Sequence, residues 1–241
     1  MNYCVNLTYY NSGGLYMNRY CYNADISMHE YKKKFNYNNI EVLELSIKYP
    51  KISLTNNPRA ENLINNRIKT EIIDFVRYSK YLYNQAIEGY HESQANNYPF
   101  HGYSAYMEYT ITYNENCFLS LYFDRYEFTG GAHGSTIRSS DTWELCHGTI
   151  LPLSSFFKPG TDYRSLLIDE MTRQAEVIQQ REDIYFDDYK ELIISNFNEN
   201  SFYLSPSGIT IYYQQYDIAP YSTGILEFTI PYDLINWHPN C

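Results

Sequence analysis

The 241-residue chain is 44% hydrophobic and carries a net charge of -10, with 18 basic residues against 28 acidic ones. A chain of this length and composition can bury a substantial core, which excludes an intrinsically disordered protein. The acidic balance argues against a nucleic-acid partner, because binding to a phosphate backbone requires clustered Lys and Arg. It attracts a cationic partner instead, or serves only for solubility.

Aromatic residues are the second signal in the composition, with 29 Tyr and 12 Phe but only 2 Trp. One interpretation is the codon usage of an AT-rich genome, since Asn, Ile and Lys are also abundant. The other is an exposed aromatic face that binds a sugar or a protein. Composition leaves both interpretations open.

The N-terminal part of the chain predicts strands followed by a helix. Two short strands are expected around a turn at residues 11–14, and a charged connection is expected at residues 32–34. Alternating apolar residues predict a strand over residues 41–53. Asn57 and Pro58 then supply an N-cap and a proline at the first helical position.

The helix that follows is predicted to be amphipathic, because its apolar residues recur at spacings of three and four. These residues are Leu63, Ile64, Ile68, Ile72, Phe75 and Val76. The segment 78–94 can continue the helix, and residues 96–99 end it with a proline.

Three strands are expected next, over residues 103–113, 117–128 and 135–145, which are rich in Tyr, Ile, Thr and Phe. Turn-forming residues separate them, so they are predicted to form an antiparallel meander.

The last third of the chain predicts a second helix capped by Thr161 or Asp162 and a shorter helix over residues 189–194. A hairpin over residues 202–213 and a final strand over residues 225–230 follow.

Helices therefore alternate with groups of antiparallel strands, which predicts an α+β fold. We expect antiparallel sheets with amphipathic helices packed on one face, in two subdomains of similar size.

The five cysteines show neither a CxxC pair nor the spacing of zinc ligands. Cys4 with Cys21, and Cys117 with Cys146, flank turns and can each form a disulfide across a hairpin, although buried free thiols fit equally well. Cys241 has no partner in either scheme.

The sequence contains no HExxH, GxSxG, Walker or GxGxxG motif, so no catalytic residue and no cofactor is predicted. The first candidate site is a loop with Gly130, Gly131 and His133, where the glycines allow close approach to a ligand and the histidine titrates near neutrality. The competing interpretation is a tight turn whose histidine caps a backbone carbonyl. No metal site is predicted either; His133 with Asp141, Cys146 or His147 is only a weak alternative, because too few ligands converge.

A second candidate lies around Pro220, where tyrosines can form an aromatic platform. The tyrosines are Tyr212, Tyr213, Tyr216 and Tyr221. Strand alternation predicts that about half of them point into the core and that Asp217 is a hydrogen-bond acceptor at the rim.

Several segments taken together resemble a known bacterial family of poorly known function. The segments are residues 129–134, 142–148, 151–153, 156–157, 215–221 and 228–232. They resemble the extracytoplasmic domain of lysozyme-sensing anti-sigma factors of the RsiV type and the matching non-catalytic region of peptidoglycan deacetylases of the PdaC type. The resemblance implies an α+β domain at 40–129 and a second α+β domain at 130–241. The short strands expected before them make residues 1–39 an N-terminal strand extension.

The same resemblance implies a non-catalytic recognition module of the cell envelope, located outside the cytoplasm. Neither sigma-factor inhibition nor deacetylation is implied, because the corresponding domains have no counterpart in this sequence. No window is long and apolar enough for a membrane span, and no signal peptide is evident.

The preferred partner is lysozyme or another cationic muramidase. The expected binding surface consists of Gly130, Gly131, His133, Tyr216, Pro220 and Tyr221. Two alternatives stay open: a module that binds peptidoglycan directly, and a wall-acting hydrolase or deacetylase-like enzyme that uses His133 as an acid-base group.

Overall fold

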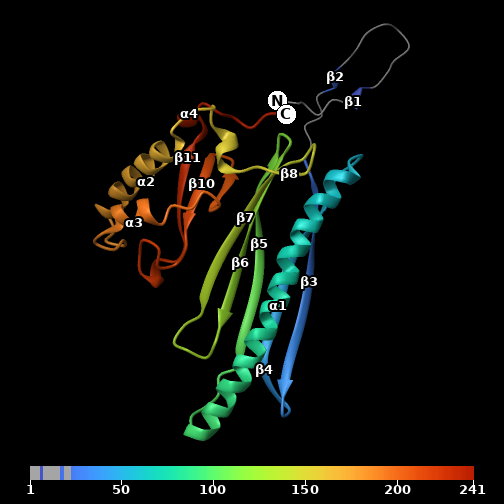
Figure 1. Cartoon of the computed structure of the whole chain (residues 1–241), viewed down its shortest axis with the longest axis vertical. Coiled ribbons are helices and arrows are strands. Elements are labelled where there is room, and N and C mark those ends of the chain that lie inside the picture. The colour runs from blue at the N-terminus through green and yellow to red at the C-terminus, as the bar shows by residue number, and fades with distance from the viewer. Residues whose placement is uncertain (1–5, 8–16, 19–22) are drawn as a thin grey trace.

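The computed structural model describes residues 6–7, 17–18 and 23–241, and contains a six-stranded sheet, a three-stranded sheet and the helices that cover them (Figure 1). The large sheet has the strand order β3-β4-β5-β6-β7-β8. Its strands are β3 (Asp25–Tyr37), β4 (Ile40–Ser53), β5 (Tyr103–Glu115), β6 (Phe118–Phe128), β7 (Ser135–Glu144) and β8 (Thr149–Ile150). The strands of the predicted meander, β5, β6 and β7, are consecutive antiparallel neighbours, so that prediction is confirmed.

The large sheet is mixed, because β4 and β5 pair in parallel. A parallel pair needs a crossover connection, and the long helix α1 (Pro58–Asn96) provides it. The α+β class is confirmed. The sequence analysis expected only antiparallel sheets, so it did not predict the parallel pairing of β4 with β5.

Helix α1 begins and ends where the sequence predicts. The side chain of Asn57 accepts a hydrogen bond from the backbone N–H of Ala60, and Pro58 occupies the first turn. At the other end Asn97 adopts the left-handed conformation with φ 55°. The buried face includes Ile64, Ile68 and Phe75, whereas Leu63 is 47% exposed, so its predicted place on the apolar face is wrong.

Residues 32–34 lie in the middle of β3, so the predicted charged connection is wrong. β3 is an edge strand, and the side chains of Lys32 and Lys34 are each 63% exposed. Lysines on an edge strand hinder pairing with another chain, so their charge is compatible with a strand at this position.

The three-stranded sheet has the order β11-β10-β9 and is antiparallel throughout. Its strands are β9 (Phe202–Ser205), β10 (Gly208–Tyr213) and β11 (Leu226–Pro231). The helices of this half are α2 (Tyr163–Gln179), α3 (Tyr189–Ser195) and α4 (Tyr232–Ile235), with short 3-10 helices η1 (Leu153–Phe156) and η2 (Tyr221–Thr223). Asp162 caps α2 by accepting from the N–H of Ser165, so the helices and the hairpin predicted here are confirmed.

Side-chain alternation along β6 joins the two halves. Leu119, Leu121 and Phe123 belong to the hydrophobic core beneath α1. Phe118 belongs to the core of the second half, and the hydroxyl of Ser120 accepts a hydrogen bond of 3.0 Å from the backbone N–H of Leu204 in β9. The helix and the small sheet therefore contact opposite faces of the large sheet.

The division of the chain at residues 39/40 and 129/130 stays a prediction. The six-stranded sheet extends beyond both positions, since β3 precedes residue 40 and β7 and β8 follow residue 129.

Near the N-terminus, β1 (Asn6–Leu7) pairs antiparallel with β2 (Met17–Asn18), as expected. The turn between them and the suggested Cys4–Cys21 pair lie outside the described residues. In the part of the chain that the structure describes, no helix is long and apolar enough to cross a membrane.

Cys117 forms a disulfide with Cys241, which corrects the predicted pairing of Cys117 with Cys146. Cys146 is itself disulfide-bonded. The Cys117–Cys241 bond joins the β5–β6 turn to the last residue of the chain, across a sequence separation of 124. No local turn signal reveals a pairing over such a distance.

Replacing both cysteines, in Cys117→Ser/Cys241→Ser, is expected to lower the free energy of unfolding by about 2–5 kcal/mol, because closing a long loop restricts the unfolded chain. Denaturant unfolding followed by circular dichroism measures this. An unchanged midpoint would show that the bond does not stabilise the fold.

Candidate functional site

The two predicted loops meet in space. The ring of His133, in the β6–β7 loop, stacks on Tyr221 with centroids 3.9 Å apart and an interplanar angle of 18°. The ring centroid of Tyr216 lies 5.9 Å from that of Tyr221. Pro220 is exposed next to them. We call His133, Tyr216, Pro220 and Tyr221 the aromatic loop cluster.

Hydrogen bonds to β7 hold the loop of residues 214–221, which contains Tyr216 and Tyr221. The side chain of Gln215 accepts from the N–H of Thr136 at 2.8 Å. Gln214 accepts from the N–H of Arg138 at 2.9 Å and donates to its carbonyl at 2.8 Å. A side-chain amide that replaces strand pairing in this way orders the loop against the edge of β7.

The glycines of the β6–β7 loop have different roles. Gly130 has φ +83°, a conformation that favours glycine. A Cβ at Gly134 would come within 2.4 Å of the ring of Tyr126, so this glycine permits close packing. Gly131 does not have a positive φ, and a Cβ at this position would meet no atom within 4 Å, so its surroundings give no local reason for a glycine.

Only two of the four tyrosines of the predicted platform are accessible at the surface. Tyr212 and Tyr213 are buried, while Tyr216 is 56% exposed and Tyr221 is half-buried, in line with the expected division. Asp217 accepts a hydrogen bond from the N–H of Gln214 at 2.7 Å, so it stabilises its own loop. Burial raises the pKa of the Asp217 carboxyl despite this hydrogen bond.

His133 shows the contacts of a structural residue. Its Nδ1 lies 3.0 Å from the carbonyl oxygen of Gly134, which is the capping geometry of a tight turn. His147 lies beyond the other end of β7, and Cys146 is disulfide-bonded. Within the described ranges no group of three or more His, Cys, Asp or Glu side chains is placed to hold a metal ion.

A buried arginine that the sequence analysis missed joins the large sheet to the small sheet. The guanidinium of Arg138, 8% exposed, donates to both carboxylate oxygens of Asp124 at 2.7 and 2.8 Å and also pairs with Glu227 of β11. It lies 3.6 Å from the ring centroid of Tyr122. Burial lowers the pKa of Arg138, but the Asp124 carboxylate outweighs burial and raises it overall.

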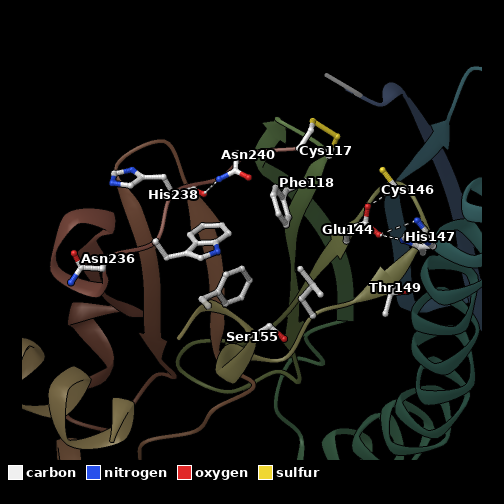
Figure 2. Close-up of a pocket in the computed structure, with 14 residues that line it drawn as sticks. Cys117, Phe118, Glu144, Cys146, His147, Thr149, Ser155, Asn236, His238 and Asn240 are labelled. Carbon is white, nitrogen blue, oxygen red and sulfur yellow. Dashed lines mark hydrogen bonds and ion pairs between the residues drawn. A yellow bond between two sulfur atoms is a disulfide. The ribbon is translucent and has the colours of Figure 1, made fainter. Parts of the chain in front are cut away.

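A separate hollow of about 560 Å³ lies between the β5–β6 turn and the C-terminal segment (Figure 2). The ring of Trp237 packs edge-on against those of Phe156 and Phe118, with centroids 4.8 and 5.5 Å apart. The Cys117–Cys241 disulfide also lines the hollow. Sequence reasoning missed this hollow, because its lining comes from segments far apart in the chain.

Glu144 and His147 lie together on one side of this hollow (Figure 2). His147 Nδ1 lies 2.7 Å from Glu144, and the same carboxylate accepts from the N–H groups of Cys146 and His147. The carboxylate thus orients the imidazole and fixes the β7–β8 turn, where the sequence predicted only a turn.

Two different family models match the first and second halves of the chain. Residues 28–136 match the family model of Deacetylase PdaC, and residues 154–233 match that of a Protein of unknown function (DUF3298). The chain is therefore similar to PdaC in its first half and to DUF3298 proteins in its second half. The predicted likeness to PdaC is therefore confirmed, and the likeness to RsiV stays a prediction.

Two crystal structures of DUF3298 family proteins have a similar fold. One from Bacteroides fragilis has a TM-score of 0.66 at 20% identity, covering 88% of this chain and 92% of that chain. One from Pseudomonas aeruginosa has a TM-score of 0.61 at 19% identity, with the same coverage. At such identities the similarity establishes the fold alone. A search of curated protein sequences gave no significant match.

Arg138→Met is expected to destabilise the protein by about 2–4 kcal/mol, because it leaves partly buried carboxylates without their cation. The matched control is Arg173→Met: Arg173 also makes two hydrogen bonds to one carboxylate, that of Glu170, but its side chain is 63% exposed. Denaturant unfolding should show a large shift for the first variant and a small one for the control. Equal shifts would contradict the structural role of Arg138.

Proposed function

We propose that this chain is a non-catalytic recognition module of the bacterial cell envelope that binds a cationic protein of the lysozyme class through the aromatic loop cluster. The observation that carries the proposal is the stacked pair of His133 and Tyr221 with the exposed Tyr216 beside it. Exposed aromatic rings held by a rigid scaffold are typical anchors of protein interfaces.

An acidic loop, residues 182–188, lies next to the aromatic loop cluster and favours a basic partner. The N–H of Phe186 donates to the carbonyl of Ile218 at 3.1 Å, and the hydroxyl of Thr223 donates to the carbonyl of Ile184 at 3.4 Å. The same loop exposes four carboxylates, on Glu182, Asp183, Asp187 and Asp188. Together with the net charge of -10, they attract a cationic protein during encounter.

Binding is favoured over turnover by the contacts of His133. Its ring faces Tyr221, and Nδ1 faces a backbone carbonyl. A general base instead needs a hydrogen-bond partner that orients it toward substrate, usually a carboxylate. The matches to PdaC and DUF3298 support a place in the envelope without assigning a reaction.

Calorimetric titration with purified lysozyme tests the proposal. We expect saturable binding at about 20 mM salt that weakens as salt rises to about 300 mM, because screening reduces attraction between exposed charges. Tyr216→Ala should weaken binding by about tenfold, as expected for an aromatic anchor.

The control is Tyr81→Ala on α1. Tyr81 is 56% exposed, as is Tyr216, and lies 5.8 Å from Tyr78 much as Tyr216 lies 5.9 Å from Tyr221. It should leave lysozyme affinity unchanged. The proposal fails if no binding occurs at low salt, or if affinity survives the double change Tyr216→Ala/Tyr221→Ala.

A further inference from the structure

The face of the large sheet opposite α1 contains two adjoining hollows, of about 420 and about 300 Å³. They share Tyr106 and Glu108, and together reach from Glu30 on β3 to Thr136 on β7. We call this combined surface the sheet trough. Five strands at the usual spacing span roughly 19 Å from the first to the last, which is long enough for a short linear ligand.

Three tyrosine rings in the trough are held in fixed positions. Tyr106 and Tyr126 are directly opposite each other on β5 and β6, with parallel rings at 7° and centroids 5.9 Å apart. The hydroxyl of Tyr106 donates to Glu44 at 3.0 Å, and the ring of Tyr126 packs on Gly134. The third ring, Tyr122, lies against the buried guanidinium of Arg138. Rings fixed in advance lose little entropy when a ligand stacks on them.

Six charged side chains line the trough, and five of them are in ion pairs; the sixth, Glu44, accepts the hydrogen bond from Tyr106. Lys48 lies 2.6 Å from Glu108, and Lys32 lies 2.9 Å from Glu30. Asp124, at the other end, pairs with Arg138. The trough therefore presents little unbalanced charge, in contrast to the acidic loop beside the aromatic loop cluster.

Paired charges and fixed rings favour a neutral ligand rich in hydroxyl groups. A carboxylate has about four acceptor positions, so one ion pair leaves others for ligand hydroxyls. The C–H face of a pyranose ring is apolar and can stack on a tyrosine ring, while its hydroxyls lie at the ring edge. An anion would have to displace a carboxylate from one of the existing ion pairs, at the cost of leaving a charge unpaired.

We propose that the sheet trough binds a neutral linear oligosaccharide, with sugar rings stacked on Tyr106 and Tyr126 and hydroxyls bonded to Glu44 and Glu108. This site lies on a different surface from the aromatic loop cluster and does not depend on the proposed binding of a cationic protein.

The test is calorimetric titration of the full chain with three neutral tetrasaccharides: cellotetraose, maltotetraose and chitotetraose. We expect saturable binding of at least one. Its affinity should be unchanged between about 20 and about 500 mM salt, because screening does not affect a neutral ligand. Absence of binding by all three, or affinity that falls steeply with salt, would overturn the proposal.

Variants locate the bound sugar. Tyr126→Ala should weaken binding by about tenfold, and Tyr106→Ala, which leaves the packing on Gly134 intact, should weaken it similarly. Tyr106→Phe retains the ring and should cost less than Tyr106→Ala. The control Tyr98→Ala, at a tyrosine that is 45% exposed and lies outside the trough, should have no effect.

Unchanged affinity in folded Tyr106→Ala or Tyr126→Ala protein would overturn the assignment. So would a loss of sugar binding in Tyr216→Ala, because that result would place the sugar on the aromatic loop cluster. Lysozyme binding that fails while sugar binding persists would contradict the proposed function alone.

Discussion

The pairing of the buried Arg138 guanidinium with carboxylates from both sheets is the interaction on which the arrangement of the molecule depends. An isolated charge in this position would be strongly unfavourable, so the arginine is stable only when Asp124 of β6 and Glu227 of β11 are both in place. The guanidinium also supports the ring of Tyr122. One side chain thus fixes the relative position of the two sheets and part of a candidate binding surface.

Successive side chains of a strand point to opposite faces of the sheet, and this alternation places Arg138 on the face toward the small sheet. Along β6 and β7, one set of side chains joins the core beneath α1, including Phe123 and Trp143. The other set faces the small sheet and the trough, including Tyr122, Asp124 and Arg138. A shift of one residue in the register of either strand would exchange the two sets, burying charges under the helix and exposing aromatic core residues. The register of the meander is therefore as important for function as for stability.

The two proposed surfaces adjoin each other but differ in charge. Gly134 packs against Tyr126 of the trough, and its neighbour His133 stacks on Tyr221 of the aromatic loop cluster. Beside the cluster lies a loop with four exposed carboxylates, whereas all but one of the charged side chains in the trough are in ion pairs. A cationic protein and a neutral glycan could therefore be recognised side by side, with opposite responses to salt.

The sequence by itself determined the local elements and the two loops of the candidate site. Asn57 and Pro58 marked the start of α1 through capping chemistry, and the proline in residues 96–99 marked its end. Apolar alternation marked β4, and enrichment in Tyr, Ile, Thr and Phe marked the strands of the meander. Glycine, proline and tyrosine marked the loops that contain His133 and Tyr221, because turn chemistry is encoded by neighbouring residues.

Only the tertiary structure decided which distant segments meet. It placed the lysines of β3 on a sheet edge, paired Cys117 with Cys241, set β4 parallel to β5, and buried Arg138 between carboxylates. It also gathered Tyr106, Tyr122 and Tyr126 into one trough. These outcomes depend on contacts between residues far apart in the chain, whose free energy is gained only when strands pair and cores pack together, so no local pattern predicts them.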